Sequence, residues 1–186
     1  MRKGCALFLV VLTVGMTGAA QAQMTPARVA ESFSEGVSEV CVPAVAVAGG
    51  ISTLPESIRA LVSPAPEAAR FLAAARNPEG PIWNLESANG VIIVSEPGPG
   101  QCEVIAYGAP VASTFASVTG VLTAADFDED LAGRQGPPFF RQEFVGVGAK
   151  TGIQIVLDGT EPGAPGRAFR FSLLSGYVTF AQPSEQ

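Results

Sequence analysis

The segment that decides the fold reads Ile82-Trp-Asn-Leu-Glu-Ser-Ala-Asn-Gly-Val-Ile-Ile-Val-Ser-Glu-Pro-Gly-Pro-Gly-Gln-Cys-Glu-Val-Ile-Ala-Tyr107. It is rich in β-branched and aromatic residues, and glycine and proline interrupt it twice. The turn Ala88-Asn89-Gly90 is a strong hairpin signal, and Pro97-Gly-Pro-Gly100 marks a second turn. The pattern predicts a three-stranded meander made of Ile82–Ser87, Val91–Glu96 and Gln101–Tyr107.

Helical patterns precede this meander. Thr25 followed by Pro26 has the form of an N-cap and a first helical residue, so we expect a helix from there to about Cys41. Its buried stripe is predicted to consist of Val29, Phe33, Val37, Val40 and Cys41. Residues 42–54 have no clear period, and we expect a loop there, with a short strand as an alternative.

A brief helix is expected at 56–62, and Ser63-Pro64 offers a cap for another helix that reaches about Arg76. Four residues of this second helix are predicted to be buried: Ala68, Phe71, Leu72 and Ala75. Asn77-Pro78 and Gly80-Pro81 should end it.

A second alternation of helix and strands follows Pro110. Val111, Phe115 and Val118 are spaced for one face of a helix, after which comes an acidic segment, Asp126–Asp130. Three strand-like stretches separated by glycine-containing turns complete the chain, at Phe139–Gly148, Gly152–Asp158 and Arg167–Ala181. The pattern predicts an α+β fold with helices packed on one face of a mainly antiparallel sheet.

Two segments of the chain look alike. Asn89-Gly-Val-Ile-Ile-Val-Ser-Glu96 resembles Thr151-Gly-Ile-Gln-Ile-Val-Leu-Asp158, and a Pro/Gly loop and another strand follow each. A helix is predicted before each block as well. The similarity raises the hypothesis of two diverged helix-plus-three-strand units behind an N-terminal helix.

Residues 1–22 have the three parts of a secretory signal peptide. Arg2 and Lys3 precede an apolar run from Cys5 to about Met16, and Ala20-Gln21-Ala22 forms an A-x-A cleavage site. A transmembrane anchor is the alternative, but the run is shorter than the roughly 20 residues that a bilayer crossing needs. We expect cleavage before Gln23, one α+β domain at 23–186, and a periplasmic or secreted location.

The charge balance bears on possible partners. Arg2 and Lys3 are two of the 11 basic residues, so nine basic residues remain beside 17 acidic ones after cleavage, a net charge of −8. Nucleic-acid binding requires a basic face that displaces counterions from phosphates, and anionic lipid surfaces attract the same kind of patch. We therefore expect neither a nucleic-acid partner nor an anionic lipid surface as a partner. No later stretch holds enough uninterrupted apolar sequence to span a membrane, so we also expect no membrane insertion after signal cleavage.

Two cysteines remain after cleavage, Cys41 and Cys102. Two thiols in an exported chain usually form one disulfide, so a disulfide between helix and sheet is the favoured interpretation. Cys102, Val104 and Ala106 fall on one face of a predicted strand, which would be the buried side of the sheet. Two free buried thiols are the alternative, because the spacing suits neither a redox motif nor a metal site without histidine.

The chain contains no histidine, which removes Ser-His-Asp and Cys-His catalysis and every histidine-containing metal site. Asp126, Asp128 and Asp130 alternate as a calcium loop begins, but the rest of that loop is missing, so a solvated acidic turn or acids at a helix N-terminus are favoured over a metal site. Gly146–Thr151 resembles a phosphate-binding loop only faintly and is interpreted as a hairpin turn. No cofactor is expected.

Carboxylates on strands are the remaining candidates for catalysis. Glu86, Glu96 and Glu103 lie on neighbouring predicted strands, and a converging pair could hydrolyse a glycosidic bond. Trp83 is interpreted as a packing residue near the sheet edge. Five further apolar residues are predicted to be core: Phe139, Phe140, Phe169, Phe171 and Leu173.

Several of these features together resemble a group of small exported proteins of unknown role from alphaproteobacteria. The resemblance rests on the helix ending in Cys41, on Gly80-Pro-Ile-Trp83, on the Asn89-Gly90 hairpin and on Gly100-Gln-Cys-Glu-Val104. It covers residues 25–110 and carries no assigned activity. It implies an extracytoplasmic location and a bridge between Cys41 and Cys102.

The leading functional hypothesis is a non-catalytic binding or protein-interaction module of the cell envelope. Its ligand would be an envelope protein or a small molecule, bound in a helix–sheet groove or at an exposed sheet edge. A small carboxylate-dependent hydrolase is one alternative, and a cleft with two converging carboxylates would favour it. An inhibitor of a secreted enzyme is another, and a protruding Gly159–Gly166 loop without a cleft would favour it.

Overall fold

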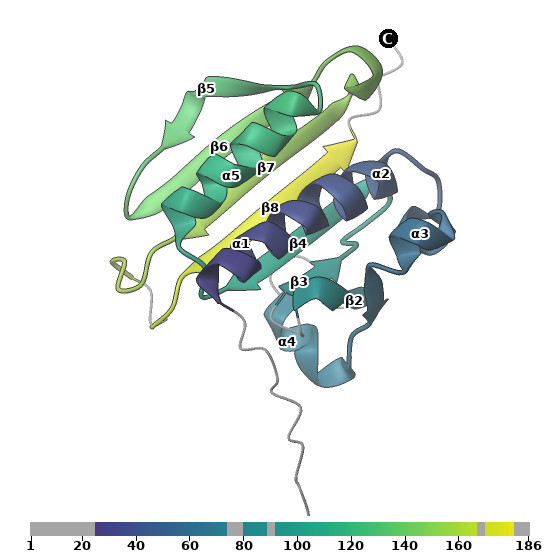
Figure 1. The fold of residues 1–186 in the computed structure, drawn as a ribbon, viewed down its shortest axis with the longest axis horizontal. Coiled ribbons are helices and arrows are strands. Elements are labelled where there is room, and N and C mark those ends of the chain that lie inside the picture. The colour runs from purple at the N-terminus through teal and green to yellow at the C-terminus, as the bar shows by residue number, and fades with distance from the viewer. Residues whose placement is uncertain (1–24, 74–79, 89–91, 167–169, 181–186) are drawn as a thin grey trace, which may run out of the picture.

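Two long helical elements lie across one face of a large antiparallel sheet (Figure 1). The computed structural model describes residues 25–73, 80–88, 92–166 and 170–180. The leader at 1–22 lies outside these residues. The α+β class with helices on one face of an antiparallel sheet is confirmed.

The sheet is built from two consecutive four-stranded meanders that join in the middle. The strand order is β1-β2-β3-β4-β8-β7-β6-β5, and every neighbouring pair is antiparallel. The strands are β1 Val62–Pro64, β2 Ile82–Leu85, β3 Ile92–Ser95, β4 Gln101–Tyr107, β5 Phe127–Gln135, β6 Phe139–Gly146, β7 Ile153–Thr160 and β8 Leu173–Phe180. The meander expected from the sequence is β2-β3-β4. The pairing of β4 with β8, from Gln101↔Thr179 to Tyr107↔Leu173, is the seam between the two halves.

One continuous helical element crosses this seam. It consists of α1 (Pro26–Glu35), a π-helical turn (Gly36–Cys41) and α2 (Val42–Val45). Thr25 caps it, its side chain accepting a hydrogen bond from the backbone N–H of Arg28 at 3.3 Å. The whole predicted stripe from Val29 to Cys41 is buried.

The helical element continues further than its sequence pattern indicates. Proline usually ends a helix, but Pro43 sits in the first turn of α2 after the wider π turn, where a missing N–H costs little. Residues 42–54 therefore hold the end of this helix and a 3₁₀ turn at Gly50–Thr53, and no strand. The expectation of a loop or a short strand was wrong for residues 42–45.

The helix approaches the sheet closely over Gly176, in the middle of β8. A Cβ atom at Gly176 would lie 2.6 Å from Cγ2 of Val37 and 3.3 Å from Cζ of Phe33. Val37 and Phe33 are fully buried, and burying each stabilises the fold by about 1.5–3 kcal/mol. The missing side chain at 176 thus allows two large apolar groups to lie directly on the seam.

The second long helix, α5 (Val111–Ala124), connects the centre of the sheet with its far edge. It follows β4 in the chain, lies lengthwise over β6 and β7, and leads into β5 (Figure 1). Val111, Phe115 and Val118 are buried, as their spacing predicts. Gly159 on β7 makes room for this helix, since a Cβ there would lie 2.3 Å from Cγ1 of Val111.

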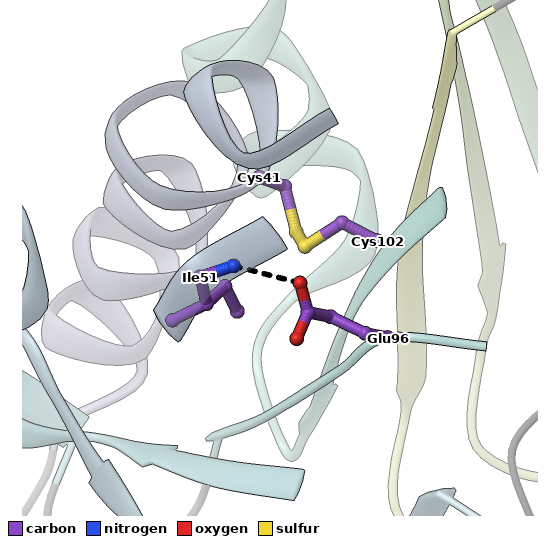
Figure 2. Close-up of a disulfide and its surroundings, with 4 residues drawn as sticks. All are labelled: Cys41, Ile51, Glu96 and Cys102. Carbon is purple, nitrogen blue, oxygen red and sulfur yellow. Dashed lines mark hydrogen bonds between the residues drawn. A yellow bond between two sulfur atoms is a disulfide. The ribbon is translucent and has the colours of Figure 1, made fainter. Parts of the chain in front are cut away.

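A disulfide joins the long helix to the sheet beside the seam (Figure 2). Cys41 and Cys102 are bonded, with a Cα–Cα distance of 5.3 Å, and both are fully buried. Because the bond closes a loop of about 60 residues, loop entropy gives it a contribution of about 4 kcal/mol to stability. Its position matches the one expected from the sequence.

The far face of the sheet is covered only in part. The short helices are α3 (Glu56–Arg59) and α4 (Arg70–Ala73), and α4 packs on that far face through a small cluster with Ile82, Ile93 and Ile105. The two long helices therefore share one face, while this short one lies on the other.

The prediction for residues 63–76 was wrong in its extent. Ser63 and Pro64 belong to the edge strand β1, and a 3₁₀ turn begins only at Glu67. Phe71 is 74% exposed and Ala68 is exposed, so neither is core. Leu72 is half-buried against the small cluster of the far face, and Ala75 lies outside the described residues.

In the second half of the chain, too, the structure of the acidic segment and the burial of several apolar side chains differ from the prediction. Asp126–Asp130 is neither an isolated acidic turn nor a helix start, because Phe127 begins β5, the edge strand. Phe139 and Phe171 are 39% and 48% exposed, so the expectation that they are core was wrong. Phe140 and Leu173 are half-buried beside the core, and Phe169 lies outside the described residues.

The hypothesis of two repeated units finds a structural counterpart with a difference in register. The two similar segments contain β3 and β7, each the third strand of its half. Ile92 and Val94 of β3 face the long helices, as do Ile153 and Ile155 of β7, whereas the sequence match aligns Ile93 with Ile155. A shift of one residue reverses the two faces of a strand, so the match does not correspond to equivalent positions.

The close approach at Gly176 can be tested by adding one methyl group. Gly176→Ala should lower the free energy of unfolding by about 1–3 kcal/mol, because its Cβ has no space below Val37. The control is Gly120→Ala in α5, where a Cβ meets nothing within 4 Å and should raise it by about 0.5–1 kcal/mol. Urea unfolding of the oxidised proteins measures both. Equal effects of the two substitutions would contradict the packing described.

Candidate functional site

A cleft lies between α5 and the hairpin of β5 and β6, with a volume of about 600 Å³. We call it the α5–β5 cleft. It is lined by Ala112, Phe115, Ala116, Thr119, Glu129, Arg134, Gln135, Gly136, Pro137, Phe140 and Gln142. Its volume lies within the range of small-molecule sites.

An irregular pairing between β5 and β6 opens the cleft. Asp130 pairs with Glu143 and Gln135 pairs with Arg141, so Leu131–Arg134 on β5 lie opposite Gln142 alone. The extra residues bulge away from the sheet, as expected where one strand carries more residues than its partner. The bulge leaves space between the edge strand and α5.

Two polar side chains project into this space from the face of the sheet that is otherwise apolar. Glu129 pairs with the core residue Phe144, so it points toward α5, and its side chain is 14% exposed. Gln142 lies between Phe140 and Phe144 on the same face and is 5% exposed. Burying such groups is unfavourable unless hydrogen bonds compensate, so their position calls for partners.

A hydrogen bond within the cleft engages Gln142, whereas one oxygen of Glu129 accepts none from the described residues. The hydroxyl of Thr119 lies 2.8 Å from the carbonyl oxygen of Phe115 and 3.2 Å from Oε1 of Gln142, and its single hydrogen serves one acceptor at a time. Oε1 of Glu129 is buried and accepts no hydrogen bond from the described residues. The nearest guanidinium nitrogen, Nη1 of Arg134, is 3.6 Å from it, in a side chain that is 56% exposed.

The apolar wall of the cleft is formed by two aromatic rings. Phe115 of α5 and Phe140 of β6 meet edge to face, with ring centroids 6.2 Å apart and an interplanar angle of 79°. Together with Ala112 and Ala116 they give the cleft an apolar side opposite its polar groups. The arrangement can hold an amphipathic small molecule.

The predicted metal candidates do not form a site. Asp128 and Asp130 lie on the face of β5 away from the helices, and Asp126 occupies the tight turn before this strand, with φ of 64°. Oδ1 of Asp130 accepts a hydrogen bond from the N–H of Ala132 at 2.9 Å. The described residues contain no group of three ligands placed to hold a metal ion.

The three candidate catalytic glutamates also lie apart. Glu86 is exposed in a 3₁₀ turn after β2. Glu103 is buried on the far face, where its Oε1 accepts a hydrogen bond from Oγ of Ser175 at 2.6 Å. Glu96 lies at the end of β3, near the C-terminal end of the long helix (Figure 2). No two of these three converge on one cleft.

A larger cavity, of about 800 Å³, adjoins Glu96. Its walls are the end of α2 with the residues up to Gly50, the turn Gly98–Gln101, Pro81 and Phe180, and among the described lining residues Glu96 is the one ionisable group. Oε1 of Glu96 already accepts a hydrogen bond from the N–H of Ile51 at 2.7 Å, which holds the 3₁₀ turn (Figure 2). This cavity is larger than the α5–β5 cleft. The α5–β5 cleft is nevertheless the better candidate for a ligand site, because it combines a carboxylate, a guanidinium and an amide with an apolar wall.

Sequence reasoning singled out neither Arg134, Gln142 nor Thr119. A signal for Gln142 exists, because it breaks the alternation of Phe140 and Phe144 at a position that should be apolar. Glu129 lies two residues after Phe127 and therefore on the same face of the strand, so it too places a polar side chain where an apolar one is expected. Arg134 gives no such signal, because it comes to the cleft only through the bulge.

Comparisons with protein-family models, with curated proteins and with solved structures find no match to this chain. The structure itself shows an α+β protein with a cleft between a helix and the sheet.

The burial of Glu96 predicts a pH-dependent contribution to stability. Burial raises the pKa of Glu96 above its ordinary 4.5, outweighing the hydrogen bond from Ile51. The folded state therefore holds this proton longer than the unfolded state does, and wild-type stability falls as pH rises through that window. Glu96→Gln does not titrate and keeps an acceptor for Ile51. Its stability relative to wild type should increase from pH 4 to pH 7.

Glu67 provides a control of opposite sign. Its hydrogen bond from Arg70 lowers its pKa, so the stability of Glu67→Gln relative to wild type should decrease over the same pH range. Urea unfolding of the three proteins at the two pH values measures both differences. A Glu96→Gln difference that stays constant with pH would show that Glu96 is not desolvated by folding.

Proposed function

We propose that this protein is an exported, non-catalytic binding protein that holds a small molecule in the α5–β5 cleft. The observation that carries the proposal is the polar set on the core face of an otherwise apolar layer. A fold selected only for stability would favour apolar residues at 129 and 142, because burying polar groups is unfavourable and an unsatisfied one, such as Oε1 of Glu129, costs about 1–3 kcal/mol. A ligand that completes their hydrogen bonds accounts for their presence.

Export is supported by the predicted leader and by the buried disulfide. Disulfides persist in oxidising compartments and are rare in the cytosol. Within the described residues, no helix has the length and apolar character needed to cross a membrane. These observations fit a periplasmic or secreted protein that is released from its leader.

The two alternative functions are less well supported. A hydrolase of the kind considered needs two carboxylates in one cleft, and among the described residues that line the α5–β5 cleft Glu129 is the one carboxylate. An inhibitor of the kind considered needs a protruding loop without a cleft, and the α5–β5 cleft is present. In the loop considered, Pro162, Gly163, Pro165 and Gly166 are exposed and Ala164 is buried.

Binding in the cleft can be tested by NMR on the mature, oxidised chain. The probes are L-phenylalanine, phenethylamine, 3-phenylpropionate and glucose, each titrated to about 10 mM, where even weak fragments bind. At least one should shift the backbone amides of α5, β5 and β6 in a saturable way. Phe140→Ala should weaken that binding about tenfold or more, because it removes half of the aromatic wall.

The matched control is Phe139→Ala. Phe139 is the neighbouring residue on the opposite face of β6, so its removal should leave binding unchanged. Unfolding curves establish that both variants are folded at the temperature of the titration. The proposed function fails if no probe shifts the cleft amides, or if both phenylalanine variants bind as wild type does.

Export can be tested on the natural product of the gene. Intact-mass analysis should find a chain that begins at Gln23, and Cys41 and Cys102 should resist alkylation until a reductant is added. A retained leader, or two cysteines that alkylate after denaturation without reductant, would contradict the proposed location.

A further inference from the structure

The polar groups of the α5–β5 cleft offer one strong acceptor beside several donors. Glu129 is an acceptor whose buried Oε1 receives no hydrogen bond from the described residues. Arg134 supplies a guanidinium with donors directed in a fork, and Gln142 supplies an amide whose oxygen is already engaged by Thr119. A ligand that matches this set must donate to Glu129 and accept from Arg134.

The charges of the cleft are close together and cancel. Nη1 of Arg134 and Oε1 of Glu129 are 3.6 Å apart, which is too long for a good hydrogen bond but close enough for an ion pair. A ligand with a net charge would leave one of the two groups without compensation. A ligand that carries one positive and one negative charge, and is neutral overall, therefore suits the cleft best.

The short separation of the two charges restricts the ligand further. An α-amino acid carries its ammonium and its carboxylate on one carbon atom, so the two charges can lie side by side against Glu129 and Arg134. The ammonium would give Glu129 the charge-assisted hydrogen bond it lacks, and the carboxylate could bind the guanidinium through both oxygens. Arg134 can adjust to it, since its side chain is 56% exposed and lies in the bulge.

The aromatic wall favours an apolar side chain over a sugar ring. Sugars stack on a single flat aromatic face, whereas the rings of Phe115 and Phe140 stand at 79° to each other and form a corner. A branched or aromatic side chain in this corner buries its apolar surface chiefly against Phe140, Ala112 and Ala116, because Phe115 is only 2% exposed. The cavity volume of about 600 Å³ accommodates one such molecule.

We infer that the α5–β5 cleft binds a free apolar α-amino acid as its zwitterion, with the ammonium on Glu129 and the carboxylate on Arg134 and the Gln142 amide. The inference rests on the proposed binding function. The side chain of the amino acid occupies the corner between Phe115 and Phe140.

The test compares L-phenylalanine with analogues that each lack one charge. Phenethylamine lacks the carboxylate and 3-phenylpropionate lacks the ammonium, while both retain the aromatic ring. L-Phenylalanine should bind the wild-type protein at least about tenfold more tightly than either, because each analogue leaves Arg134 or Glu129 uncompensated. Calorimetry or amide shifts measure the dissociation constants.

Variants then assign the two charges to their residues. Glu129→Gln and Arg134→Gln should each weaken L-phenylalanine binding by about tenfold or more, and Glu129→Gln should reduce the advantage of L-phenylalanine over 3-phenylpropionate. The matched control is Glu143→Gln, whose carboxylate pairs with Nε of Arg141 at 2.7 Å on the opposite face of the sheet. This control should bind L-phenylalanine as wild type does.

The outcomes separate the ligand class from the binding function. If phenethylamine, 3-phenylpropionate or glucose shifts the cleft amides as strongly as L-phenylalanine or more strongly, the zwitterion inference is wrong and the binding function stands. Unchanged binding of L-phenylalanine to Glu129→Gln and to Arg134→Gln also overturns the inference. If no probe shifts the cleft amides, the proposed function itself fails.

Discussion

The packing of the long helix on the β4–β8 seam is the contact on which the rest of the structure depends. The two meanders follow each other in the sequence, joined by α5, and among the described residues their strands pair only where β4 meets β8. Phe33 and Val37 cover this seam because Gly176 leaves space for them, and the disulfide from Cys41 to Cys102 fastens the same helix to β4. One helix therefore holds both halves of the sheet in one body.

The α5–β5 cleft, the proposed binding site, lies away from this rigid centre, at the opposite end of the second half. The seam is apolar and tightly packed, whereas the edge strand β5 bulges and exposes Arg134. Binding sites commonly combine a rigid scaffold with a locally irregular segment, because regular strands leave no space for a ligand. Glu129 and Gln142 face into that space from the ordered strands, so their positions depend on the scaffold while Arg134 can adjust.

Local patterns predicted the parts of this fold that depend on one element at a time. The stripe from Val29 to Cys41 and the β2–β3–β4 meander follow from periodicity and turn residues, and the disulfide follows from its compartment and from the buried face of Cys102. The short helix α4 and the exposed Phe71 could not be predicted, because an edge strand from Val62 to Pro64 takes up the residues that would cap a longer helix. The cleft was missed for a similar reason. It arises from unequal strand lengths between β5 and β6, and pairing between strands leaves no mark on the residues of either one alone.

Native-state hydrogen exchange of the oxidised mature protein tests most directly whether the long helix makes one cooperative body of the two halves. The amides of α1, β4 and β8 should exchange with a common free energy of opening, equal to that of global unfolding, and those in the centre of β7 should share it. An opening of β6, β7 and β8 that occurs at a distinctly lower free energy, while α1 and β4 stay protected, would contradict this account.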